Sequence, residues 1–311
     1  MAIQQYPLDK TFLVAAWLEA ILYGIYFCLF WFSVYISIRG RRMKSQNSIM
    51  FFTSIAMFII ATMHIALNGY RAITGYVDFA STPGGPVAFV GLISSWHHIT
   101  KDVLYTCQSI LGDAMAVYRC WILWNRDYKF VLLPFCLLLM SAVSGSMVTI
   151  LFATSDPNAS IFDSRLTDWI TVFTSIAVAQ NVLTTGLMAF RLWNTERNSS
   201  QIRVGRGVFL PILRILVESA ALYLFVEILM LTFYQANYNP QYIVLETITP
   251  VVGITFVLIT IRIVLRSQQS SQESEVHDLH ATVGSMPIRR RIAVNITTRM
   301  DDGADGKMSP V

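Results

Sequence analysis

Residues 11–38 read TFLVAAWLEAILYGIYFCLFWFSVYISI, and this run contains a single charged side chain, Glu19. A helix needs about 20 mainly apolar residues to cross the hydrocarbon core of a bilayer, which is roughly 30 Å thick. The run is therefore long enough to span a membrane. It is also too long for the apolar segment of a cleavable signal peptide, so we expect an uncleaved signal anchor.

The rest of the chain has the same character. Of its 311 residues, 54% are hydrophobic and only 14% are charged, and the mean hydropathy is +0.53. Soluble domains carry about 25% charged residues, so the composition excludes an ordinary soluble domain. It predicts an all-α, seven-transmembrane helix bundle whose main partner is the lipid bilayer, with no nucleic-acid partner. The seven expected spans are Thr11–Ile38, Ser48–Asn68, Ile99–Trp124, Lys129–Ala153, Trp169–Trp193, Val208–Gln235 and Tyr242–Arg266.

Basic residues in the short connections predict the orientation, because Lys and Arg are retained on the cytoplasmic side. One set of connections carries ten such residues (Arg39, Arg41, Arg42, Lys44, Arg126, Lys129, Arg191, Arg197, Arg203 and Arg206), and the opposite set carries four (Lys10, Arg71, Lys101 and Arg165). Residues 1–10 are thus expected outside, residues 11–266 in the membrane and residues 267–311 as a disordered cytosolic tail. Asn158, in an Asn-x-Ser triplet, would then be a candidate for external glycosylation, and the plasma membrane is the expected location.

The apolar stretch Pro86–Trp96 is too short to cross a bilayer, and it follows the turn-forming residues 82–85 (TPGG). We expect an interfacial or re-entrant segment that leads into the third span. The alternative is that this stretch forms the first part of a longer, kinked third helix.

Motifs that carry catalysis or bind a cofactor are absent from the sequence. There is no H-E-x-x-H, no G-x-S-x-G and no P-loop, and the last predicted span contains no lysine that could hold retinal as a Schiff base. The expectation is a protein that is not an enzyme and has neither a cofactor nor a metal.

Ionisable side chains within the predicted spans form two groups by depth. Charged groups near the middle of a bilayer cost several kcal/mol, so they normally face the bundle interior and pair. The outer group lies about two helical turns from the outer face and consists of Glu19, His64, Glu227 and Glu246. In a sequential ring of helices, Glu19, His64 and Glu246 would converge on a polar pocket for a cationic or hydrogen-bond-donating small molecule, or for a proton. The alternative is that each residue only forms a hydrogen bond that fixes helix packing.

The inner group consists of Asp113 and Arg119 in the third span and Arg214 and Glu218 in the sixth. Asp113 and Arg119 are six residues apart, about 120° around a helix, so they pair poorly with each other. We expect Arg119 to pair with Glu218 across the two spans, with Arg214 joining Glu218 at i,i+4. This ionic lock would be a two-state element of the receptor kind, and the alternative is a static buried pair.

Short motifs carry a resemblance to a known group of proteins. They are residues 18–24 (LEAILYG), Gly112-Asp113, residues 118–121 (YRCW), residues 218–223 (ESAALY) and residues 250–253 (PVVG). With these motifs the chain resembles, from about Thr11 to Arg266, a large group of seven-span membrane proteins of basidiomycete fungi. The resemblance implies the seven-span architecture and carries no activity with it.

The sequence therefore supports two functional hypotheses. The first is a receptor-like membrane protein with an outer pocket for an unidentified small-molecule ligand, the inner lock and a cytosolic signalling partner. The second is a proton-coupled small-molecule transporter, in which the same acidic side chains carry protons.

Overall fold

The structure is a computed structural model, and it describes residues 6–39, 45–154, 164–199 and 209–284. Within these residues every regular element is a helix. The chain divides into two compact units, residues 1–268 and residues 269–311. All the side chains that matter for the site belong to the first unit.

Seven long helices and one short helix form the described chain: α1 (Leu8–Arg39), α2 (Ser45–Ile73), α3 (Gly85–Val90), α4 (Trp96–Leu123), α5 (Leu132–Thr154), α6 (Ser164–Ser199), α7 (Phe209–Gln235) and α8 (Gln241–Gly284). Five of them are long and apolar enough to cross a membrane, namely α1, α2 with the π-helical turn after it (Thr74–Asp78), α5, α6 and the first half of α8. The prediction of an all-helical polytopic membrane protein is confirmed at this level.

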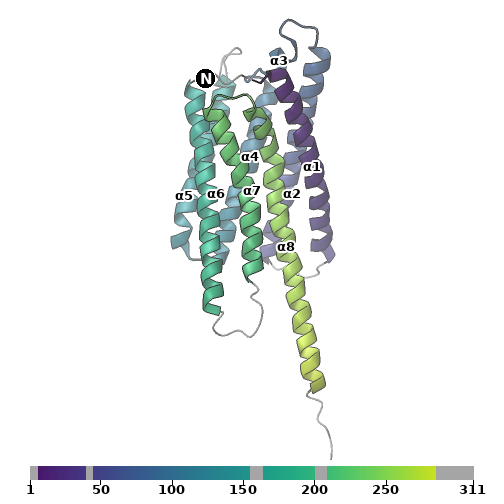
Figure 1. Cartoon of the computed structure of the whole chain (residues 1–311), viewed down its shortest axis with the longest axis vertical. Helices are drawn as coiled ribbons and strands as arrows, with labels where there is room; N and C mark the ends of the chain where they lie inside the picture. The colour runs from purple at the N-terminus through teal and green to yellow at the C-terminus, as the bar shows by residue number, and fades with distance from the viewer. Residues whose placement is uncertain (1–5, 40–44, 155–163, 200–208, 285–311) are drawn as a thin grey trace, which may run out of the picture. The chain divides into compact units, whose positions relative to one another are not determined.

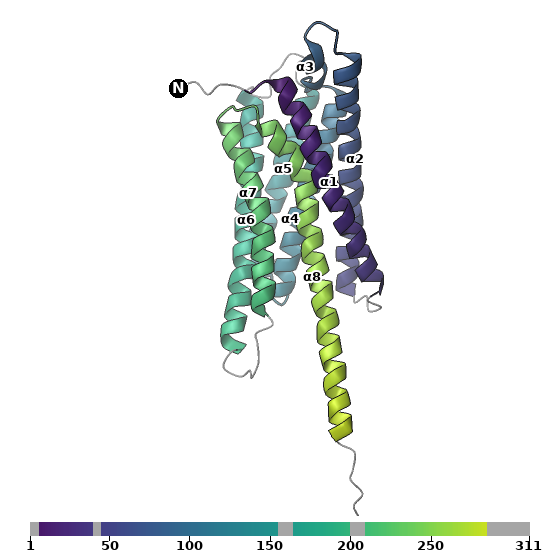
Figure 2. The same ribbon diagram turned by 45° about the vertical axis from the view of Figure 1, so that its right-hand side comes forward.

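The long helices of the first unit run side by side (Figures 1 and 2). Helix α2 contacts both α1 and α4, and α6 contacts α4, α5 and α7. Helix α8 is the most enclosed of the five apolar helices, because 83% of its most apolar window is buried, against 17% for α1. Its core residues pack with Tyr26 of α1, Met57 of α2 and Met115 of α4. Polar side chains on this part of α8 therefore face protein rather than lipid.

The segment before the third long helix forms a separate helix, α3, which ends at Val90 before α4 begins at Trp96. Gly84 and Gly85, at the entry to α3, have φ values of +94° and +61°, a backbone conformation that favours glycine. Arg71 Nη2 donates to the Val90 carbonyl at 2.6 Å and so fastens α3 to α2. The alternative of one long, kinked third helix is wrong, because the break after Val90 separates α3 from α4.

The structure also differs from the expected tail. Helix α8 continues to Gly284, past the predicted end of the last span at Arg266. Residues 267–284 contain no proline and several good helix formers, which allows the helix to continue. Residues 285–311 and the glycosylation candidate Asn158 lie outside the described residues, so their assignments stay predictions.

Candidate functional site

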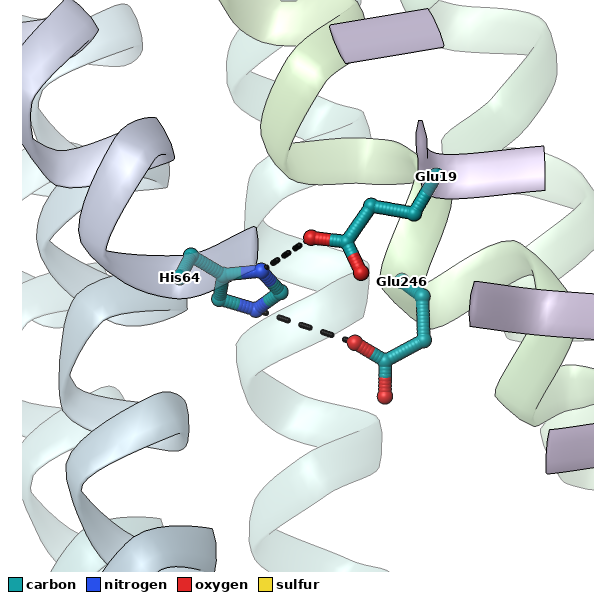
Figure 3. Close-up of side chains that lie close together, drawn as sticks. All are labelled: Glu19, His64 and Glu246. Atoms are coloured by element: carbon teal, nitrogen blue, oxygen red, sulfur yellow. Dashed lines mark hydrogen bonds and ion pairs between the residues drawn. The ribbon is translucent and has the colours of Figure 1, made fainter. Parts of the chain in front are cut away.

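Three side chains from three helices meet in the bundle interior (Figure 3). His64 of α2 lies with its Nδ1 at 2.7 Å from Oε1 of Glu19 on α1, and its Nε2 at 3.8 Å from Oε2 of Glu246 on α8. One imidazole ring thus faces a carboxylate on each side. The structure brings together three of the four residues that the sequence assigned to the outer pocket.

Two further side chains complete this cluster, which we call the imidazole network (Glu19, His64, Asn68, Lys101 and Glu246). Asn68 donates to Oε2 of Glu19, and Lys101 of α4 donates to Oε1 of Glu246. Sequence reasoning missed both partners. Asn68 had a usable signal, because it follows His64 by four residues and so lies on the same helix face. Lys101 gave none, because a lysine near the start of a span is normally solvated.

Burial makes pairing in the imidazole network obligatory. Each of its side chains is at most 8% exposed, and a buried charge is costly unless it is paired and hydrogen-bonded. Arg71 and Asp102 lie within electrostatic reach of the same groups. When all of them are ionised, the carboxylates of Glu19, Asp102 and Glu246 exceed the cations of Lys101 and Arg71 by one negative charge. One proton on His64 neutralises this excess.

The same atoms have the spacing of a metal site. Glu19, His64 and Glu246 each offer one ligand atom, and these atoms lie within 4.8 Å of one another. However, Lys101 and Arg71 already oppose the carboxylate charge, and Asn68 and Lys101 occupy one oxygen of each carboxylate. A divalent cation would leave an excess of positive charge in a buried place, so the charge balance favours a proton.

Glu227, the fourth expected pocket residue, does not join the imidazole network. It lies on α7, 2% exposed, where its Oε2 accepts from Nδ2 of Asn181 on α6 at 3.2 Å. Asp113 of α4 is buried within electrostatic reach of it. Glu227 therefore belongs to a second polar cluster, deeper along α4, together with an inner-group residue.

The predicted lock between Arg119 and Glu218 is wrong. Among the described residues, no ion pair joins them; the Arg119 guanidinium lies 4.6 Å from the centre of the Phe256 ring, and the Glu218 side chain is exposed. The physical reason is helical phase, because Glu218 and Glu227 are nine residues apart and so face opposite sides of α7. Since Glu227 faces inward, Glu218 faces outward. The side chain of Arg214 lies outside the described part of the structure.

Polar side chains continue along the inner face of α4 between the two clusters. Gln108 Nε2 donates to the Thr249 carbonyl of α8 at 3.2 Å, and Ser109 Oγ lies 3.5 Å from the Tyr223 hydroxyl of α7. From Lys101 to Arg119 this face covers about 27 Å at 1.5 Å per residue, close to the roughly 30 Å of a hydrocarbon core.

Two small cavities lie beside this polar face. One of about 30 Å³ is bordered by Asp102, Tyr105 and Gln241, and one of about 50 Å³ is bordered by Asp113, Arg119 and other polar side chains. A cavity needs about 10–15 Å³ to hold one water molecule, so both have room for water. The arrangement as a whole can hold and exchange protons within a helical bundle.

No protein-family model, no curated protein and no solved structure matches the chain.

Proposed function

We propose that the chain is a seven-span protein of the plasma membrane with its N-terminus outside and its C-terminal tail in the cytosol. Helices α4 and α7 have 28 and 27 residues, which is enough to span, and α4 turns its charged side chains into the bundle. The ten-to-four distribution of basic residues between the two sets of connections supports the orientation. We include membership of the fungal seven-span group in this proposal, because the motifs that carry the resemblance lie within the same seven predicted spans.

We further propose that the protein is receptor-like and that the imidazole network is its responsive element. The observation that carries this proposal is a single buried imidazole between carboxylates of α1 and α8, with α4 tied to the same carboxylate of α8 through Lys101. A change in the charge of His64 alters the balance that holds four helices together. A proton, or a hydrogen-bonding small molecule that enters from outside, would thereby shift the bundle between two arrangements, which a cytosolic partner would detect.

Hydrogen–deuterium exchange of the purified full chain in lipid nanodiscs tests this role. Amide protection in α1, α2 and α8 should differ between samples held at about pH 5 and at about pH 8. The variant His64→Gln should lose this difference, whereas His277→Gln, which removes a histidine of the second unit, should retain it. If the His64→Gln chain folds and keeps the wild-type pH dependence, the network is not the responsive element.

A proton-coupled transporter is the second candidate, and the polar face of α4 with its water-sized cavities favours it. A transporter acts without a cytosolic partner. The purified chain in liposomes should therefore acidify the lumen, as reported by an enclosed pH-sensitive dye, when a proton gradient and substrate are supplied. Lys101→Met should impair this flux because it disrupts the polar face. If candidate solutes across chemical classes give no proton movement, the transporter hypothesis is contradicted and the receptor hypothesis is unaffected.

A further inference from the structure

We propose that the 50 Å³ cavity between α4, α6, α7 and α8 is a binding site for a hydrated monovalent cation. We call it the Asp113 cavity, and its polar border consists of Asp113, Arg119, Asn181, Thr184, Thr185, Tyr223 and Thr255. The site is separate from the imidazole network, and the proposal holds whether the protein signals or transports.

The border of the cavity contains polar atoms that have no hydrogen-bond partner among the described residues. Oδ2 of Asp113 and Oγ1 of Thr255 are both buried without a hydrogen bond, and their side chains are 2% and 8% exposed. Unpaired buried oxygens are costly, so such atoms normally have a water molecule or an ion as their partner. The cavity has room for roughly three to five water-sized occupants.

Arg119 borders the same space and has two polar atoms without a partner among the described residues. Its guanidinium is held over the Phe256 ring, while its Nε and Nη2 donate to no acceptor among the residues that the structure describes. These two donors need acceptor oxygens that the side chains around them do not supply. Water in the hydration shell of a bound ion would supply them and would separate that ion from the guanidinium.

Charge decides the class of ion. Asp113 lies within electrostatic reach of Glu227, and Arg119 is the cationic side chain on the border of the cavity. When both carboxylates are ionised, they exceed the guanidinium of Arg119 by one negative charge, which one monovalent cation neutralises. A divalent cation would leave +1, and an anion would leave −2, each buried.

The ligand atoms point to a hard cation. Hard cations such as Na⁺ are coordinated by carboxylate, amide and hydroxyl oxygens. The cavity is bordered by such oxygens, and the thioether of Met188 is the one soft ligand atom among its bordering residues. Asn181 is already oriented, because its Nδ2 donates to Glu227 and its Oδ1 accepts from Thr185 at 3.2 Å. The oxygen of Asp113 is therefore the main anionic ligand.

Thermal unfolding of the purified full chain tests the site. The midpoint is measured at constant pH and constant chloride in sodium, potassium or N-methyl-D-glucamine, the last of which is too large for the cavity. Binding to the folded state alone should raise the midpoint by about 3 °C in one of the small cations, and the rise should saturate with concentration. The variant Asp113→Asn should lose this rise, while Asp168→Asn, an exposed acid on α6, should keep it.

The remaining outcomes overturn the proposal. Equal midpoints in all three cations mean that the cavity holds water only, and a midpoint that follows pH but not the cation means that the carboxylates share a proton instead. If Asp113→Asn fails to fold, Thr255→Val removes one oxygen with little change of shape and should weaken the cation effect. An unchanged effect in a folded Thr255→Val chain, together with an unchanged effect in Glu227→Gln, contradicts the site.

Discussion

At the scale of the single residue, the ion pair between Lys101 and Glu246 joins two helices that are far apart in sequence. Both side chains are buried, at 4% and 2% exposed, so each protects the other from being an isolated charge. Removing one partner of a buried pair typically costs about 3–5 kcal/mol, much of it from the charge left behind. The pair therefore contributes little net stability, but neither residue can be replaced without a large cost while the other remains.

We expect Lys101→Met and Glu246→Gln each to lower the free energy of unfolding by about 3 kcal/mol, and the double variant to lose clearly less than the sum. The measurement is a double-mutant cycle by denaturant unfolding in mixed micelles. Lys129→Met is the control, because Lys129 is exposed and its loss should cost at most about 0.5 kcal/mol. Strictly additive losses would mean that the two groups do not interact.

Two glutamates of α7 give a second prediction at this scale. Glu227→Ala removes the acceptor of the buried Asn181 amide and should cost about 1–3 kcal/mol. Glu218→Ala should have a much smaller effect, because that side chain is exposed. Unfolding midpoints of the two variants compare an inward and an outward acid on one helix. A larger loss for Glu218→Ala would mean that α7 is rotated relative to the arrangement described above.

At the scale of the element, close approach between helices depends on glycine. A Cβ on Gly253 of α8 would lie 2.5 Å from the ring of Tyr26 on α1. Gly112 of α4 and Gly145 of α5 are close contacts of the same kind, because a Cβ there would lie 2.8 Å from Val252 and 2.6 Å from Thr106. Helices in a bilayer rely on such positions, since packing rather than the hydrophobic effect drives their association.

Gly253→Ala should therefore destabilise the bundle by about 1–3 kcal/mol through overpacking against Tyr26. Gly24→Ala in α1 is the matched control, because nothing lies within 4 Å of the added methyl group. That substitution should be neutral or slightly stabilising, since alanine favours a helix by about 1 kcal/mol over glycine. The unfolding midpoints of both variants in the same detergent provide the comparison, and equal midpoints would contradict the tight α1–α8 contact.

The sequence was sufficient to predict where the long helices lie in the chain, but not how each helix is rotated about its axis. Apolar runs and turn residues predicted seven segments, each of which overlaps one long helix of the structure, because length and hydropathy are local properties. Glu19, His64 and Glu246 could be grouped because a sequential ring of helices places the last long helix beside the first two. The partner of Arg119 could not be found, since its guanidinium faces the Phe256 ring and that contact depends on the rotation of α8, which no local pattern encodes.

At the scale of the whole molecule, the proposal of an external ligand and a cytosolic partner depends on the orientation of the chain in the membrane. We expect an N-terminal extension with a glycosylation acceptor to be modified, and the same extension at the C-terminus to remain unmodified. A mobility shift that an endoglycosidase reverses provides the measurement, and Asn158→Gln separates natural modification from that of the tag. Modification of the C-terminal extension alone would invert the topology and place the imidazole network on the cytosolic side.

The burial of α8 has a consequence for biosynthesis. This helix follows its neighbours in the chain, and most of its apolar window is buried among them. The enclosed centre of the bundle is therefore synthesised after the helices that surround it. Until residue 246 has been synthesised, the ammonium group of Lys101 lacks the carboxylate with which it pairs in the folded chain. We therefore expect a chain that ends before Gln241 to lack both this counter-ion and the most enclosed helix of the bundle, and to be unstable.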